Sequence, residues 1–215
     1  MDTSSTTSIP LAERIEELLC TEGPLPIVAA GDPVLRTVAE PYRGQLDDAL
    51  LHRFVAALRE TMLAAPGVGL AAPQVGVPLS IAVVEDRARG PRETLEARSR
   101  TPLAFRVLVN PSYEPEGETK SAFFEGCLSV PGWQAVVARH ALIRLRAQDE
   151  QGQVIDELFT GWPARIVQHE TDHLNGTLYL DVARLRSLST NEAVAEYWSQ
   201  PTPELAAATL GFELT

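Results

Sequence analysis

The chain has 215 residues, 45% hydrophobic and 22% charged, which indicates one globular domain with a full core and short additions at its ends. Its net charge of −11 argues against general binding to nucleic acid, and no apolar run reaches the roughly 18 residues that span a membrane. Two cysteines are too few for a disulfide framework, and the first residues do not form a signal peptide, so we expect a cytoplasmic protein.

The first 24 residues are predicted to form an N-terminal extension. Residues 1–9 are rich in Ser and Thr and offer little to bury, so we expect disorder there. Pro10 is suited to open a short amphipathic helix, and the Gly-Pro-Leu-Pro sequence at 23–26 breaks that pattern. We therefore place the start of the main domain at residue 25.

A long amphipathic helix is predicted after Asp47 and Asp48, whose charges favour the N-terminal end of a helix. Its apolar face repeats with the helical period and comprises Leu51, Phe54, Val55, Leu58, Met62 and Leu63. The segment 67–76 that follows is small, apolar and irregular, and Gln74 is its single polar side chain. Such a segment suits either a tight loop beneath a sheet or the backbone wall of a binding site.

Five extended segments are expected along the middle of the chain. They are residues 80–84, residues 105–109, a strand that ends at Cys127, a long strand over 135–147 and a returning strand over 154–159. Two polar segments lie between them: 85–102 is predicted to be a solvated loop and 112–120 to be rich in turns. Further along we expect a short extended piece at 178–180 and helices at 191–200 and 203–210, within a C-terminal helical extension over 186–215.

The sequence Gln-His-Glu-Thr-Asp-His that ends at His173 carries the strongest functional signal. On a helix, His169 and His173 lie on one face and can bind the same metal ion. Glu170 could reach the open side of that ion. Thr160 is a candidate cap for this helix, and Asn175 is a candidate end. The same residue types at this spacing also occur on solvated helices, so the motif alone leaves both interpretations open.

A catalytic metal site of this kind usually has three protein ligands and an open position for water. The third ligand could be His, Asp, Glu or Cys, and Cys127 is the best candidate because it lies at a strand end beside a glycine. A lone cysteine is also often a small buried residue. With Cys127 as a ligand, Glu170 would act as general base, and the Gln74 amide and the Leu128 N–H would stabilise an oxyanion. These residues predict metal-assisted hydrolysis of an amide or a related bond.

Three stretches resemble the three signature motifs of the peptide deformylases, in the same chain order. They are Gly-Val-Gly-Leu-Ala-Ala-Pro-Gln at 67–74, Glu-Gly-Cys-Leu-Ser at 125–129 and Gln-His-Glu-Thr-Asp-His at 168–173. The resemblance implies an α+β fold in which antiparallel strands form small sheets around a central helix that carries the two histidines. It also implies a catalytic domain over 25–185 that removes the N-terminal formyl group from formyl-methionine of newly synthesised proteins.

The same resemblance makes Cys127, His169 and His173 the ligands of one divalent metal ion. Residue types alone would favour zinc, whereas the family typically uses ferrous iron, and zinc, nickel or cobalt can occupy the site. We therefore expect Fe²⁺.

The resemblance further makes Glu170 the catalytic acid and base, and it makes Gln74 and the Leu128 N–H the oxyanion donors. Gly69 would contribute backbone contacts to the substrate. A contact with the ribosome near its exit tunnel is a further expectation, because the substrate is the nascent chain.

An apolar pocket for the methionine side chain is implied at Val68, Phe123, Trp162, Arg165 and Ile166. Arg165 departs from the family pattern, in which an apolar residue is common. We expect its stem to pack in the pocket wall while its charge reaches solvent.

Two other functions fit parts of the same pattern. A metallopeptidase of broader specificity would share the His-Glu-x-x-His motif, but a third His or Glu ligand further along the chain is missing and the Cys127 motif counts against it. A purely structural metal site would normally have four protein ligands, whereas we find three and a glutamate placed for catalysis.

Overall fold

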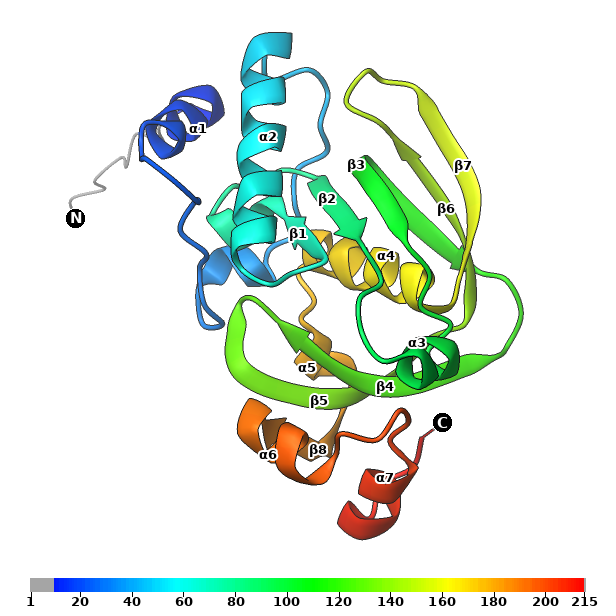
Figure 1. Cartoon of the computed structure of the whole chain (residues 1–215). Coiled ribbons are helices and arrows are strands. Elements are labelled where there is room, and N and C mark those ends of the chain that lie inside the picture. The colour runs from blue at the N-terminus through cyan, green and yellow to red at the C-terminus, as the bar shows by residue number, and fades with distance from the viewer. Residues whose placement is uncertain (1–9, 215) are drawn as a thin grey trace, which may run out of the picture.

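The computed structural model describes residues 10–214, so the predicted disorder of residues 1–9 lies outside the described part of the chain. Two antiparallel sheets surround a helix, α4 (Gly161–Leu174), which carries both histidines (Figure 1). This arrangement confirms the α+β fold expected from the motifs. No helix in the described residues is both long and apolar enough to cross a membrane.

The larger sheet has five strands in the order β1-β2-β3-β6-β7, and each strand pairs antiparallel with its neighbours. Its strands are β1 (Gly69–Ala71), β2 (Ile81–Asp86), β3 (Leu103–Pro115), β6 (Leu142–Gln148) and β7 (Val154–Thr160). The inner residues of β2 are buried on both faces, since the α2 helix lies on one side and α4 on the other. Strand β1 lies at the edge of this sheet and contacts α4.

The smaller sheet has three antiparallel strands in the order β4-β5-β8. They are β4 (Lys120–Cys127), β5 (Val130–His140) and β8 (Ala183–Thr190). In Figure 1 this sheet lies below α4, opposite the five-stranded sheet. Helix α4 contacts strands of both sheets, and 11 of its 14 residues are buried. It is therefore the central element of the molecule.

Local geometry explains where α4 begins. Gly161 has a φ of +63°, and a Cβ there would lie 2.4 Å from the carbonyl oxygen of Ser99, so only glycine fits. Thr160 occupies the cap position as expected, but its hydroxyl donates to the carbonyl oxygen of Ala141 and not to the helix. The helix ends at the predicted position, with Asn175 as its C-cap.

The predicted long helix is α2 (Asp48–Ala64), and the Asp47 carboxylate accepts the Leu50 N–H at 2.8 Å as its N-cap. The short helix α1 (Leu11–Leu19) packs against α2, and Ile15 is completely buried in the same core. The N-terminal segment thus contributes to the main core. Cys20, which ends α1, is exposed.

Several expected elements are wrong in detail. The loop predicted over 85–102 contains a short helix, α3 (Arg92–Ala97), and β3 continues to Pro115 into the segment expected to be turns. The long strand predicted over 135–147 is two strands, β5 and β6, which meet at Ala141 and belong to different sheets. No Gly, Pro, Asn or Asp lies near Ala141, so the sequence gives no turn signal at the change of sheet. The extended piece at 178–180 lies mostly within a single helical turn, α5 (Tyr179–Val182).

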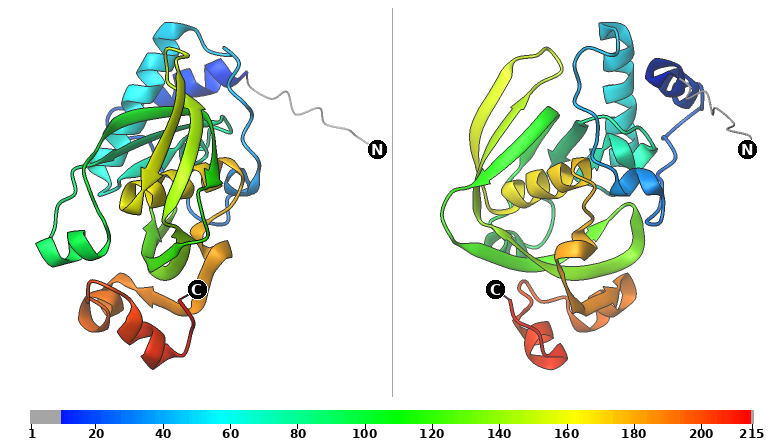
Figure 2. Two further views of the ribbon diagram at one scale, coloured as in Figure 1. Left: turned by 90° about the vertical axis from the view of Figure 1, so that its right-hand side faces the viewer. Right: turned by 180° about the vertical axis from the view of Figure 1, so that it is seen from behind.

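The predicted C-terminal helices are α6 (Asn191–Tyr197) and α7 (Glu204–Leu210). They lie against the smaller sheet on the side away from α4, as both views of Figure 2 show. Apolar residues of these helices pack against Phe124 and Val136. Two short 3₁₀ helices, η1 (Pro33–Arg36) and η2 (Ala72–Val75), complete the fold.

Candidate active site

Cys127, His169 and His173 come together where the end of β4 meets α4. The Cys127 Sγ lies 3.2 Å from the His173 Nε2, and one potential ligand atom from each residue lies within 4.8 Å of the others. A shift in the strand register between Gly126 and Cys127 accompanies this placement of the thiol. One thiolate and two imidazoles are a donor set that suits Zn²⁺ or Fe²⁺, and three ligands leave a position open. The three side chains form a Cys/His/His metal site.

The two imidazoles lie in different electrostatic surroundings. Burial lowers the pKa of His173, and the neighbouring His169 lowers it further, which favours the neutral ring, the form that binds a metal. Burial also lowers the pKa of His169, but hydrogen bonds to Cys127 and to Glu125 raise it well above its ordinary value. These hydrogen bonds favour the charged form of the His169 ring.

Glu125 fixes the orientation of His169. Its Oε2 lies 3.1 Å from the His169 Nδ1, which leaves the Nε2 of that ring to face the metal site. Arg139 donates two hydrogen bonds, of 2.9 and 3.0 Å, to the Glu125 carboxylate. Its remaining nitrogen donates to the Asp172 carboxylate. Burial raises the pKa of Glu125, but Arg139, His169 and Arg165 together hold it well below its ordinary value. The carboxylate therefore stays charged inside the protein.

Arg165 is the second arginine that pairs with Glu125. The expectation that its charge reaches solvent is wrong. The side chain is 5% exposed, and it donates hydrogen bonds to Glu125, to the carbonyl oxygen of Val137 at 3.0 Å and to that of Ser121. A buried guanidinium needs such partners because its isolated charge would be costly to desolvate. Arg165 thus closes an ion cluster beneath the metal site.

Glu170 points from α4 toward the edge strand β1. It is 4% exposed, its Oε2 has no hydrogen-bond partner among the described residues, and burial raises its pKa to about 7. A Cβ on Gly69 would lie 2.2 Å from the Glu170 Oε1, so the carboxylate occupies the space that a side chain on β1 would fill. Glu170 is therefore a buried carboxyl group whose pKa suits proton transfer near neutral pH.

Gln74 approaches the site from η2 on the other side of Cys127. Its Oε1 accepts the Ala71 N–H at 2.9 Å, and this bond turns the amide Nε2 toward the Cys127 Sγ at 3.6 Å and the Ser129 Oγ at 3.3 Å. The side chain is buried, and its orientation is set within its own segment. An N–H donor is thus fixed beside the metal site.

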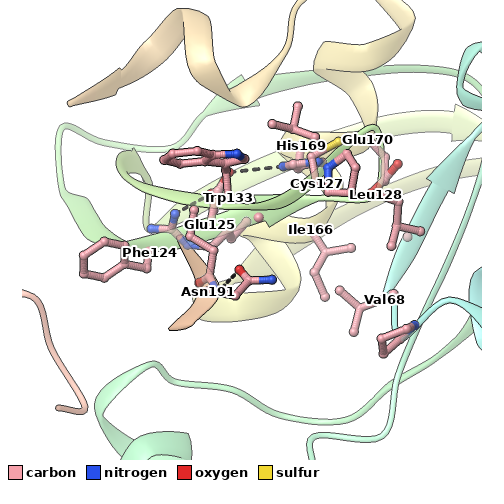
Figure 3. A pocket seen from close by; sticks show the side chains of 18 of the residues that line it. Val68, Phe124, Glu125, Cys127, Leu128, Trp133, Ile166, His169, Glu170 and Asn191 are labelled. Atoms are coloured by element: carbon pink, nitrogen blue, oxygen red, sulfur yellow. Dashed lines mark hydrogen bonds and ion pairs between the residues drawn. The ribbon is translucent and has the colours of Figure 1, made fainter. Parts of the chain in front are cut away.

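A cavity of about 530 Å³ opens in front of these groups. In Figure 3, His169, Cys127 and Glu170 lie together in one part of it, and Ile166 and Val68 lie below them. Of the residues predicted from the sequence, those that line it are Val68, Gly69, Gln74, Cys127, Leu128, Trp162, Arg165, Ile166, His169 and Glu170. His173 is not among the residues that line this cavity, although its Nε2 lies 3.2 Å from the Cys127 Sγ. Phe123 lies behind Trp162, with ring centroids 5.9 Å apart, and borders a smaller cavity of about 80 Å³.

Sequence reasoning assigned no role to several residues of this site. Glu125, Arg139 and Asp172 form the ion cluster, and the clue for Glu125 was a charge inside an apolar strand, two positions before Cys127. Asn191, at the start of α6, also lines the cavity and accepts a hydrogen bond from Gln134 at 3.0 Å (Figure 3). The C-terminal segment is therefore part of the cavity wall.

Comparison with known proteins adds a second line of information. The model of the polypeptide deformylase family matches residues 24–188. Peptide deformylase 1 of Streptomyces coelicolor is 72% identical over 206 residues, which cover 96% of this chain and 94% of that protein. The peptide deformylase of Bifidobacterium adolescentis is 48% identical, and the match covers 98% of each chain. The crystal structure of a class I type b peptide deformylase from Acinetobacter baumannii with bound Met-Ala-Ser superposes with a TM-score of 0.68 at 32% identity, covering 75% of this chain and 99% of that one.

Proposed function

The chain belongs to the polypeptide deformylase family, and from this membership and the site geometry we propose how its residues hydrolyse the formyl amide of formyl-methionine. The observation that carries the proposal is the position of Glu170, whose unpartnered carboxylate oxygen lies beside the Cys/His/His site at the cavity. We assign catalysis to the domain formed by residues 25–185, with extensions on either side.

Cys127, His169 and His173 would hold one divalent metal ion, which supplies a Lewis acid that polarises the formyl carbonyl and lowers the pKa of water. Glu170 takes the proton from the attacking water, because its pKa near 7 makes it an effective base at neutral pH. The same carboxyl group then gives the proton to the methionine nitrogen as the C–N bond breaks. Formate and a free N-terminal methionine are the products.

The negative charge that develops on the formyl oxygen needs donors that are already in place. The amide nitrogen of Gln74 is held by the Ala71 bond and faces the site, so it costs no reorientation at the moment of reaction. The backbone N–H of Leu128, the residue after the cysteine ligand, is the second donor. Gly69 offers the substrate its backbone from β1.

Ferrous iron is the metal that we propose, with zinc, nickel or cobalt as possible substitutes. The thiolate and imidazole donors support a metal of this class, and the family resemblance favours Fe²⁺ over Zn²⁺. Glu125 supports either metal, because it holds His169 in the orientation that a ligand needs.

The substrate is a nascent chain that begins with formyl-methionine. The similar enzyme from Acinetobacter baumannii binds Met-Ala-Ser, a peptide of the kind that deformylation releases. The side chains of Val68, Trp162 and Ile166 offer apolar surface for the methionine, with Phe123 behind and the Arg165 stem beside them. We propose a cytoplasmic enzyme that meets its substrate near the ribosomal exit tunnel.

Formate release from formyl-Met-Ala-Ser by anaerobically purified protein tests this proposal, together with metal analysis of the same sample. We expect stoichiometric formate, about one iron per chain and no cleavage of unformylated Met-Ala-Ser. Air should inactivate the iron form by oxidising the metal or Cys127. Cleavage of unformylated peptides would favour a broader metallopeptidase, and activity that persists for days in air would argue against iron.

A further inference from the structure

Three guanidinium groups gather around one indole ring at the side of the cavity. Arg98 and Arg100 follow α3, and Arg165 comes from α4. Their central carbons lie 5.2, 5.4 and 5.4 Å from the ring centroid of Trp162, and all three side chains line the cavity. The α3 segment therefore brings positive charge to a site in a chain whose net charge is −11.

Two of these three charges are neutralised within the protein. Arg100 makes hydrogen bonds of 2.7 and 2.9 Å to Asp86, and Arg165 pairs with Glu125. Arg98 differs, since no carboxylate of residues 10–214 lies within ion-pair distance of it. Its Nε donates only a long bond of 3.4 Å to the carbonyl oxygen of Pro201, in the segment between α6 and α7.

The surroundings of Arg98 are unfavourable to its charge. The side chain is partly buried, and burial together with the charges of Arg100 and Arg165 lowers its pKa. A partly desolvated cation beside two other cations is stabilised by an anion, and the face of Trp162 offers it only a modest compensation. The cavity is the open side from which an anion could arrive.

The chemistry of the substrate restricts what that anion can be. A formylated N-terminus carries no charge, the methionine side chain is neutral, and the C-terminal end of a nascent chain is far away. The anions that remain near the start of the peptide are the side chains of aspartate and glutamate.

We propose that Arg98 is a specificity residue that favours formylated peptides with an acidic side chain at one of the two positions after methionine. This inference rests on the proposed function. It gives α3 a role, since the loop that contains this helix places the unpaired guanidinium at the cavity. The proposal also gives the C-terminal segment a role, because the carbonyl oxygen of Pro201 accepts a hydrogen bond from the Arg98 guanidinium.

Four C-terminally amidated peptides test the proposal: formyl-Met-Glu-Ser, formyl-Met-Ser-Glu and their glutamine counterparts. The amide removes the terminal carboxylate, and glutamine keeps the shape of glutamate without its charge. We expect kcat/KM to be about tenfold higher for glutamate than for glutamine at one of the two positions, as for a hydrogen bond to a charged group. The ratio should fall toward one in about 0.5 M NaCl, which screens a partly exposed charge pair.

In Arg98→Met the glutamate-to-glutamine ratio should approach one while the rates for the glutamine peptides stay near those of the wild type, and Arg98→Lys should keep part of the preference. Arg92→Met is the matched control, because Arg92 is an exposed arginine on α3 that pairs with Glu96 on the same helix, and it should leave the ratio unchanged. A wild type without a glutamate preference at either position would overturn the proposal, as would a preference that survives in Arg98→Met or that does not respond to salt. The salt series needs only the wild type, so it decides the matter if Arg98→Met does not fold. Absence of formate from all four peptides would instead contradict the proposed function.

Discussion

Replacing Gly69 by alanine tests the position of Glu170 with the smallest possible change. The added Cβ would lie 2.2 Å from the Glu170 Oε1, whereas ordinary contact begins at 3.4 Å. The difference between 3.4 and 2.2 Å means that the carboxylate must retreat by about 1.2 Å, or that β1 must move by a similar amount. A misplacement of about 1 Å can cost roughly 100-fold in rate, so we expect kcat of Gly69→Ala to fall by about two orders of magnitude.

The assay is formate release at saturating formyl-Met-Ala-Ser, with metal content and thermal stability measured on the same preparation. Metal content should remain normal, because the three atoms nearest to the added Cβ all belong to Glu170. Gly117→Ala is the control for general destabilisation: Gly117 has a φ of +89° in a turn with no neighbour within 4 Å, so alanine strains the backbone without touching the site. If Gly69→Ala keeps kcat within threefold of the wild type, the inferred role of Glu170 at this position is wrong.

Three further substitutions examine other parts of the site. Glu170→Gln should retain metal and lose at least about 100-fold in kcat/KM, and near-normal turnover would remove Glu170 as the general base. Cys127→Ser should lower the metal content measured by elemental analysis, and an unchanged content would exclude Cys127 as a ligand. Arg165→Met should lower the free energy of unfolding in urea by about 3 kcal/mol, because Glu125 loses a buried partner. The control for Arg165→Met is Arg144→Met, which removes an exposed ion pair with Asp156. It should change the unfolding curve little.

The parts of the site that the sequence predicts are those that depend on local periodicity. His169 and His173 share a helix face because of their spacing, and the helix indeed carries them to one ion site. Gln74 was singled out as the only polar side chain in an apolar segment, and it is buried beside Cys127. Cys127 itself required more than periodicity, because its partners are 46 and 42 residues away along the chain. Its place at a predicted strand end beside a glycine made it the best candidate for the third ligand, and the family motifs supported the same choice.

The parts that the sequence did not predict depend on contacts between distant segments. Strands β5 and β6 follow one another with no Gly, Pro, Asn or Asp near Ala141, so no turn signal marks the residue at which the chain passes from one sheet to the other. Arg165 was expected to reach solvent because a single sequence does not show that Glu125 lies opposite it. Arg98 lay in a segment expected to be a solvated loop, and its position over Trp162 depends on the packing of α3.

The buried ion cluster of Glu125 is better explained by its effect on the metal site than by stability. Replacing a buried ion pair by well-packed apolar groups is often neutral or stabilising, so such a cluster is a poor source of folding free energy. What Glu125 does provide is a fixed acceptor for the His169 Nδ1, and Arg139 and Arg165 hold that acceptor charged and in place. The metal ligands come from β4 in one sheet and from the helix that packs against both, so metal binding joins the two halves of the fold. Because the same carboxylate orients a ligand and anchors two arginines, a change in the pocket wall at Arg165 reaches the metal through Glu125, although Arg165 is not itself a ligand.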